Sequence, residues 1–362
     1  MKNNGKYLYF EVMRIIACFF VIFNHTGKKG FYLFLEHKPG GILFFADLFI
    51  AVFCKFSVPL FFAISGALFL ARENEPFKVL WKKRIGKIAM VLVVFSLIYY
   101  LVEVGMGTES LSIGRFLSRF YEKNWNFSFW YLYAYIPFLM CLPFLRALVK
   151  NLSNQHFYYW FGLALVFTGL IPCLQYILCQ DRWTLNEHFN AAWLCSEIVL
   201  YPCLGYFLQH RFDLTEHRNK LPLLWLVNAA AIGISCFMTY YRMQVTGNRS
   251  GNQELQVFYN SFVFINCAAV FLTVKDIFSR IRLSARLEQM IELLGSCTFG
   301  IYLLHLMVLK KIPFFTGLWD SIWIGMGNFH MLAAFLICFC VMGICCVLTL
   351  LLKKIPVIRY LF

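Results

Sequence analysis

Apolar runs of about 20 residues recur along this chain of 362 residues and constrain its fold more than any other feature. A hydrocarbon core of roughly 30 Å needs about 20 helical residues to cross it. With 60% hydrophobic and only 14% charged residues, the composition excludes an ordinary set of soluble domains. We therefore predict an all-α, polytopic transmembrane helical bundle with ten spans, at about residues 7–25, 43–70, 85–104, 128–148, 157–179, 191–208, 221–241, 257–274, 291–309 and 329–352.

The net charge of +15 comes from 33 Lys and Arg residues against 18 Asp and Glu residues. In a soluble chain this excess would raise the question of nucleic acid, but in a membrane protein the positive-inside rule is the simpler explanation. Ten spans place both termini on one side, and segments on that side hold 20 Lys and Arg residues against 11 on the other. The difference predicts cytoplasmic termini and no nucleic acid partner. The 11 outer cations are Lys28, Lys29, Lys38, Arg115, Arg119, Lys123, Arg182, Arg242, Arg249, Lys310 and Lys311.

The chain is expected to form one membrane domain over residues 1–362, because no soluble domain or internal repeat is visible. No cleavable signal peptide is expected, since the first apolar stretch contains Glu11 and Arg14 and lacks a small-x-small cleavage site.

Nearly all of the 14 cysteines lie in apolar spans and suit a role as small fillers, with only Cys173 and Cys179 near one helix end as a pair to test for oxidation. Neither a Gly-rich phosphate loop nor a Cys/His metal-ligand spacing occurs, so no bound metal is expected.

Ionisable residues inside a span are costly, so each one marks a candidate functional site. The first span contains three of them, Glu11, Arg14 and His25. Arg14 and His25 are eleven positions apart, which places them within about 20° of one helix face. The rise along the helix from Arg14 to His25 is roughly 16 Å. Glu11 lies three residues before Arg14, a spacing that predicts an ion pair. A permanent cation in the inner half and an imidazole near the outer surface could divide anion binding from general base catalysis.

Other interpretations of these charges remain open. A histidine at a helix end beside Asn24 can be merely interfacial, and Arg14 could serve only to neutralise Glu11. Lys55, in the sequence FCKF, is either a site residue or a snorkelling side chain.

The first span resembles the opening helix of the acyltransferase-3 superfamily of bacterial integral membrane acyltransferases, in which an arginine is followed after ten residues by a histidine. Arg14 and His25 match that pattern. The resemblance covers residues 7–309, with two departures: Lys87 replaces a second arginine and loses its bidentate fork, and Glu11 stands where aspartate is common. Further matches follow in the family's order: Ser57–Gly66 (SVPLFFAISG) resembles its paired phenylalanines and Ile-Ser-Gly, Arg84 and Lys87 its Arg-x-x-Arg pair, Phe129–Leu132 (FWYL) its Trp-Phe-Leu segment, and Phe299–His305 (FGIYLLH) its Tyr-x-x-His ending.

The resemblance implies an O-acetyltransferase of a bacterial envelope. Family members move an acyl group, commonly acetyl, from a cytoplasmic acyl coenzyme A to a hydroxyl of a carbohydrate or lipid-linked sugar, often at the opposite face. The donor, acetyl coenzyme A, would be a co-substrate and not a bound cofactor. Its phosphates predict donor binding by Arg84, Lys87 and Lys83, although a plain positive-inside loop is equally natural there. Arg14 could steady the pantetheine arm or the thioester.

The resemblance also implies that His25 takes the proton from the acceptor hydroxyl while donors stabilise the developing oxyanion. The candidate oxyanion or acceptor-binding residues are Ser65, Asn24, Trp130, Tyr302 and His305. Three of them have other interpretations: Ser65 could be a small packing residue in a Ser-Gly pair, Trp130 an interfacial anchor, and His305 an interfacial packing residue.

Two rival functions remain. One is a transporter or flippase of an acyl unit, amino acid or polysaccharide, which would favour inverted repeats and matched helix breaks; the prolines in or near spans show no matched pattern. The other is a non-catalytic subunit of a polysaccharide synthase. The expected location is the bacterial cytoplasmic (inner) membrane, where the multi-pass protein would meet membrane lipid, acyl coenzyme A, a glycan acceptor and candidate polysaccharide-biosynthesis partners.

Overall fold

Helices make up most of the fold, as the apolar runs predict. The computed structural model describes residues 2–3, 6–180, 182–189, 191–356 and 358–361. The expected single domain also includes residues that lie outside this description, namely Met1, Asn4, Gly5, Asp181, Asn190, Val357 and Phe362.

Seventeen α-helices lie within the described residues, joined by short turns of tighter or wider helix. Strands β1 (Lys2–Asn3) and β2 (Lys6–Tyr7) form a small antiparallel pair before the first helix. The α-helices are α1 (Leu8–Asn24), α2 (Ile42–Phe53), α3 (Ser57–Phe69), α4 (Phe77–Val79), α5 (Gly86–Gly105), α6 (Ile113–Glu122), α7 (Trp130–Asn151), α8 (Asn154–Leu165), α9 (Ile171–Cys179), α10 (Ala192–Cys195), α11 (Glu197–His210), α12 (Leu214–His217), α13 (Leu221–Thr246), α14 (Val263–Arg280), α15 (Ala285–Leu306), α16 (Pro313–Gly325) and α17 (His330–Leu352). The 3-10 turns are η1 (Gly27–Lys29), η2 (Leu33–Glu36), η3 (Cys54–Phe56), η5 (Phe127–Phe129), η7 (Arg218–Lys220), η8 (Gln253–Gln256) and η10 (Ile358–Leu361), and the π-helical turns are η4 (Leu80–Ile85), η6 (Val166–Leu170) and η9 (Met307–Lys311).

Seven helical stretches of the described chain are long and apolar enough to cross a membrane, and each coincides with an expected span. The other three expected spans correspond to α1, α11 and α14, which have 17, 14 and 18 residues. The polytopic helical class is thus confirmed, while the count of ten and the cytoplasmic side of the termini stay predictions. The seven stretches are Ile42–Phe69, Phe77–Gly105, Phe127–Asn151, Asn154–Cys179, Leu214–Thr246, Ala285–Lys311 and His330–Leu352.

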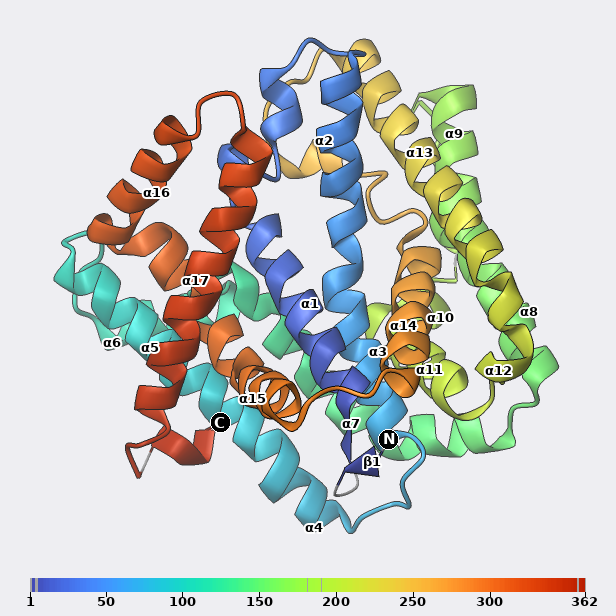
Figure 1. Cartoon of the computed structure of the whole chain (residues 1–362), viewed down its shortest axis with the longest axis horizontal. Helices are drawn as coiled ribbons and strands as arrows, with labels where there is room; N and C mark the ends of the chain where they lie inside the picture. The colour runs from blue at the N-terminus through green and yellow to red at the C-terminus, as the bar shows by residue number, and fades with distance from the viewer. Residues whose placement is uncertain (1, 4–5, 181, 190, 357, 362) are drawn as a thin grey trace.

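Helix α1 lies in the middle of the bundle (Figure 1). It contacts α3, α14, α15 and α17, and its side chains belong to both of the large hydrophobic clusters of the core. Protein contacts on several sides replace contacts with lipid, so this helix can carry ionisable residues that a lipid-facing helix could not.

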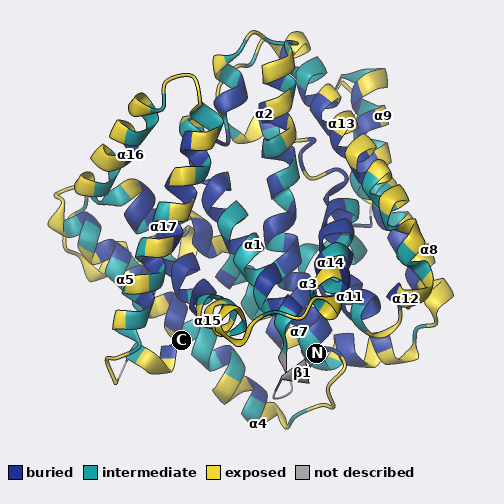
Figure 2. Ribbon diagram, viewed as in Figure 1, coloured by how far each residue is buried: buried dark blue, intermediate teal, exposed yellow. Residues whose placement is uncertain are grey.

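The peripheral helices expose apolar side chains. Figure 2 shows the buried residues gathered toward the centre and exposed positions along α8, α13 and α16. On α13, Leu226 and Phe237 are 67% and 55% exposed, and on α17 Phe339 is 58% exposed. Large apolar side chains at this level of exposure suit contact with lipid, not with water.

The fourteen cysteines, all within the described chain, are free thiols. Nine of them are buried, which suits the predicted role as apolar fillers. Cys173 and Cys179 belong to this set of free thiols, so no disulfide joins that pair in the described structure.

Two glycines allow α3 and α11 to pack with their backbones in contact. A Cβ atom at Gly205 would overlap the carbonyl group of Ala63, and one at Gly66 would overlap the carbonyl group of Pro202. Small residues at such a crossing let helices pack closely in a membrane. Gly66 of the ISG sequence therefore has a packing role. This is the role that the packing interpretation of the Ser-Gly pair gives it.

Gly205→Ala should destabilise the bundle by about 1–3 kcal/mol, because the new methyl group forces the α3 and α11 backbones apart. Thermal unfolding of the purified protein in detergent would show a lower midpoint. Gly233→Ala in α13 is the matched control, since no atom lies within 4 Å of its added Cβ, and it should raise the midpoint slightly. Equal midpoints for the two variants would contradict the close crossing.

Candidate active site

Two cavities lie within the bundle, and the polypeptide of α1 contributes to both. The Arg14 cavity, of about 460 Å³, contains Arg14 and Val21 of α1. The His25 cavity, of about 540 Å³, contains His25, which directly follows the last residue of α1. Arg14 and His25 thus line two separate cavities.

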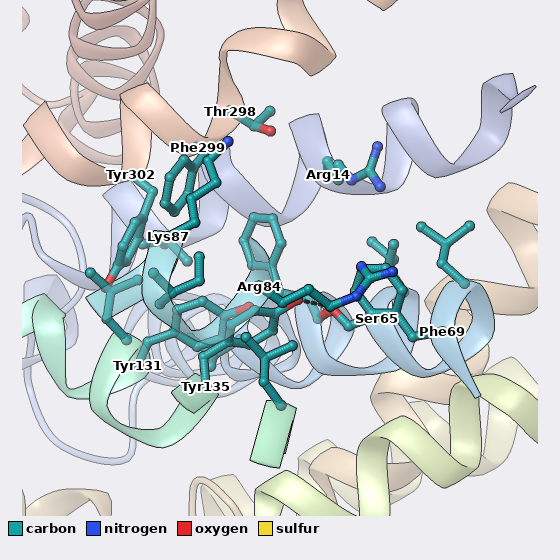
Figure 3. A pocket seen from close by; sticks show the side chains of 18 of the residues that line it. Arg14, Ser65, Phe69, Arg84, Lys87, Tyr131, Tyr135, Thr298, Phe299 and Tyr302 are labelled. Atoms are coloured by element: carbon teal, nitrogen blue, oxygen red, sulfur yellow. Dashed lines mark hydrogen bonds between the residues drawn. The ribbon is translucent and has the colours of Figure 1, made fainter. Parts of the chain in front are cut away.

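The Arg14 cavity combines cations with apolar and aromatic walls. Arg14 comes from α1, Lys83 and Arg84 from η4, and Lys87 from α5, and all four line the cavity. Figure 3 shows the side chains of Arg14, Arg84 and Lys87, which come from different elements, and Tyr131 and Tyr135 of α7 along one wall. The remaining wall is mostly apolar, with Val58, Phe61, Ile64, Leu68, Phe69, Ile88, Leu132, Leu139 and Phe299.

The predicted ion pair between Glu11 and Arg14 is present, with Arg14 Nη1 2.5 Å from Glu11 Oε1. Both side chains are largely buried, at 12% and 27% exposure. Gly295 of α15 packs against Glu11 so closely that an added Cβ would overlap the carboxylate. A charge in this location needs a partner to offset its desolvation, and Glu11 provides it.

Glu75 holds two arginines near the same cavity. Its Oε1 accepts a hydrogen bond from Arg84 Nε at 2.5 Å and lies 3.7 Å from Arg146 Nη2. The buried Arg146 also donates to the Phe69 carbonyl oxygen at 3.0 Å. This cluster fixes the position of Arg84 at the cavity wall.

His25 lies in the second cavity beside another histidine. It is 8% exposed, and its ring centroid lies 5.3 Å from that of the fully buried His305. His305 Nδ1 is 2.6 Å from the carbonyl oxygen of Tyr302, and because a carbonyl can only accept, Nδ1 must donate. The other nitrogen, Nε2, has no hydrogen-bond partner among the described residues. A neutral His305 therefore holds an unused acceptor nitrogen in a ring packed against His25.

A thin layer separates the two cavities. Val21 lines the Arg14 cavity and His25, four residues later, lines the other; Tyr302 and Leu306 of α15 divide in the same way. Four helical residues rise about 6 Å, so about one turn lies between the cavities. The ring of His305 is in this layer, 6.0 Å from Tyr302 and 5.3 Å from His25 between centroids.

Lys55 points inward and makes hydrogen bonds, which favours a site residue over a snorkelling side chain. Its Nζ donates to Asn24 Oδ1 at 3.0 Å and to Gln256 Oε1 at 2.6 Å, and it lies 4.7 Å from the ring centre of Phe31. Gln256 in turn donates to the hydroxyl of Tyr32. This Lys55 network ties the residue before His25 to η3 and to η8.

The predicted oxyanion or acceptor residues differ in what their polar atoms already bind. The Ser65 hydroxyl lines the Arg14 cavity, 2.9 Å from the Phe61 carbonyl oxygen and 3.1 Å from the Tyr135 hydroxyl. Tyr302 donates its proton to the Ser128 carbonyl oxygen at 2.7 Å.

Asn24 is the predicted candidate whose amide can still donate. An ammonium group only donates, so the Asn24 oxygen faces Lys55 and its NH₂ group makes no hydrogen bond within the described part of the chain. Trp130 is 36% exposed and, like Asn24, belongs to neither cavity lining. The structure therefore gives Trp130 no contact with the candidate site.

Comparisons with known proteins place the chain in a family. A family model described as an acyltransferase domain, acyltransferase-3, matches residues 7–351. The chain belongs to the acyltransferase-3 family. Comparisons with curated proteins and with solved structures gave no match. Membership together with the apolar helices makes this chain a multi-pass membrane acyltransferase.

Several residues of the candidate site were not predicted from the sequence. Tyr131 and Tyr135 line the Arg14 cavity, although Trp130 is the one residue of the FWYL segment that was predicted to belong to the site. Gln256 and Glu75 lie in polar connecting segments that carry no motif. The spacing of Tyr131 and Tyr135, four residues apart on one helix face, is the signal that could have identified the wall.

Lys55→Met should lower acyl transfer and the free energy of unfolding together, because it leaves the oxygens of Asn24 and Gln256 without a donor, at about 1–3 kcal/mol. Transfer assays and thermal unfolding would measure both. Lys38→Met, an exposed lysine outside both cavities, should change neither. A Lys55→Met protein with normal activity and stability would show that the Lys55 network has no role.

Proposed function

We propose that this acyltransferase moves an acetyl group from acetyl coenzyme A in the Arg14 cavity to a hydroxyl of an envelope carbohydrate or lipid-linked sugar in the His25 cavity. The observation that carries the proposal is that a cationic cavity and a histidine cavity lie about one helical turn apart, on the same two helices. A short thioester arm can cross such a distance, whereas a whole donor cannot. We also propose the bacterial cytoplasmic membrane as its location, with polysaccharide-biosynthesis proteins as partners.

The Arg14 cavity suits the donor. Coenzyme A joins a phosphate-rich nucleotide to a slender pantetheine arm that ends in the thioester. Lys83, Arg84 and Lys87 lie together on one stretch of chain, where phosphates would find charge-assisted hydrogen bonds. The apolar and aromatic wall beyond them suits the arm, and Arg14 supplies a cation deeper in the bundle that can steady the arm.

The chemical step uses His25 as the general base. The acceptor hydroxyl attacks the thioester carbonyl carbon, and its proton passes to His25 as the new C–O bond forms. The tetrahedral oxyanion is stabilised by the amide group of Asn24, the residue before His25. The C–S bond then breaks, the proton on His25 passes to the coenzyme A thiolate, and the acetyl ester remains on the acceptor.

His305 acts as a positioning residue in this scheme. Its Nδ1 is committed to the Tyr302 carbonyl oxygen, so the ring orientation is fixed and Nε2 is available as an acceptor beside His25. A hydrogen bond from His25 to this nitrogen would leave the opposite nitrogen of His25 free to accept a proton. His305 thereby selects the catalytic tautomer of His25.

His25→Ala and Arg14→Ala should each reduce transfer of radiolabel from acetyl coenzyme A to an envelope-glycan extract, the former by about 10²–10⁴-fold. Scintillation counting of the purified glycan measures the transfer. Equal label with both variants and the unaltered protein would overturn the catalytic assignment. No transfer, together with movement of substrate across proteoliposomes, would support the transporter alternative instead.

Arg84→Gln should raise the KM for acetyl coenzyme A about tenfold and leave kcat nearly unchanged, because it removes a charged donor to a phosphate group that does not react. Steady-state kinetics at saturating acceptor would separate the two constants. Lys82→Gln is the matched control, since Lys82 is exposed on the same turn but does not line the cavity. An equal KM for the two variants would favour a purely topological role for these cations.

A further inference from the structure

Cations gather in the His25 cavity, on the side where the positive-inside rule predicts few of them. Four of the eleven Lys and Arg residues assigned to outer segments line this one cavity, namely Arg119, Lys123, Lys310 and Lys311. Membrane topology explains an excess of cations on the side of the termini but gives no reason for this group. We propose that the acceptor is acidic, a saccharide whose anionic group, carboxylate or phosphate, binds Lys123 and Lys310. The inference rests on the proposed acetyl transfer at His25.

Two of the four cations are neutralised within the protein. Glu103 is 5% exposed and accepts hydrogen bonds from Lys311 Nζ at 2.6 Å and from Arg119 Nη1 at 3.2 Å. Arg119 also bonds to Glu109 at 3.1 Å and lies 4.2 Å from the ring centre of Trp125. These contacts join the cavity wall into a fixed structure, so Arg119 and Lys311 serve to build the cavity.

The other two cations keep their charge for a ligand. Lys123 and Lys310 are exposed, line the cavity and make no ion pair or hydrogen bond within the described part of the chain. Lys123 follows α6, and Lys310 lies on η9 after α15, so two separate segments bring their ammonium groups to one space. Because Glu103 is the only carboxylate in the described lining, the cavity has a net positive charge.

The neutral part of the wall suits a sugar ring. Phe127 is 60% exposed and packs edge to face with His25, with ring centroids 5.9 Å apart. An exposed aromatic face beside the proposed base can hold the apolar face of a pyranose while its edge hydroxyls approach the imidazole. The side-chain nitrogen of the buried Asn126 has no hydrogen-bond partner among the described residues and can donate to a hydroxyl. Aromatic ring, neutral donor and free cations together match an acidic sugar better than a neutral one.

The test measures direct binding to the full-length protein in nanodiscs by titration calorimetry. Three soluble trisaccharides would differ only in the terminal unit, which is glucose, glucuronic acid or glucose 6-phosphate. A fourth probe, glucose joined through diphosphate to a short polyprenyl chain, presents the anionic group as a lipid link. The variants are Lys123→Gln and Lys310→Gln, and the matched control is Lys28→Gln, an exposed lysine three residues after His25 that lines neither cavity.

We expect at least one anionic probe to bind roughly tenfold or more tightly than the neutral trisaccharide, and the preference to shrink at higher salt. Each lysine substitution should weaken that probe about threefold to tenfold and leave the neutral trisaccharide unchanged, whereas Lys28→Gln should alter neither. The probe that gains most identifies the source of the charge as carboxylate, sugar phosphate or lipid diphosphate. Equal affinity for all four probes, or binding insensitive to both lysines, would overturn the proposal.

Acetyl transfer to the same probes separates the two proposals. Transfer to neutral and acidic probes with equal kcat/KM would leave the acetyltransferase standing and exclude the acidic acceptor. Lysine-dependent binding of an anionic probe without transfer to any probe would support the anionic site and overturn the proposed reaction. Loss of coenzyme A binding in the lysine variants would show that the substitutions disturb the fold. In that case the Lys123→Arg and Lys310→Arg variants, which keep the charge, decide the question. Restored binding of the anionic probe supports the proposal, and its absence overturns it.

Discussion

The ion pair between Glu11 and Arg14 is the interaction on which the central helix depends. Both groups lie among packed helices, where one unpaired charge would cost several kcal/mol. Glu11 fits there because Gly295 of α15 has no side chain to occupy its space. The pair thus couples the α1–α15 contact to the presence of a cation in the Arg14 cavity. Removing either partner alone would leave the other charge largely buried and unpaired. The same substitution would therefore disturb both the packing of α1 on α15 and the chemistry of the Arg14 cavity.

A single layer of about one helical turn gives the two cavities different tasks. On the Arg14 side the cations are set by the Glu11 and Glu75 pairs, and on the His25 side the proposed base lies between His305 and Phe127. α1 and α15 both cross this layer, so their packing determines the distance between the proposed donor and acceptor sites. Proximity of this kind lowers the barrier only when the reacting atoms are held within contact distance. In the proposed reaction, a rigid pair of central helices is therefore a catalytic requirement as well as a structural one.

The sequence predicted the helical class, seven of the spans and the Glu11–Arg14 pair because these depend on composition and local spacing. It could not distinguish α1, α11 and α14 from lipid-facing spans, since an apolar run looks the same whether protein or lipid covers it. The FWYL segment shows the same limit at one residue: Trp130 is exposed and Tyr131 lines the Arg14 cavity. Neighbours on a helix point about 100° apart, and only tertiary packing sets which of them faces inward.

Outer Lys and Arg residues that the positive-inside rule does not explain can indicate a binding site. With the predicted cytoplasmic termini, the positive-inside rule would account for 20 of the 33 Lys and Arg residues without any ligand. Of those that it does not explain, Lys29 pairs with Asp320 and Arg115 with Glu109, so their charge is balanced on the surface. Lys123 and Lys310 instead meet at the cavity that holds His25, without a carboxylate partner in the described chain. Uncompensated charge in a concave site attracts ions of opposite sign and raises their local concentration, so the same two lysines that topology cannot explain would also bring an acidic acceptor to the base.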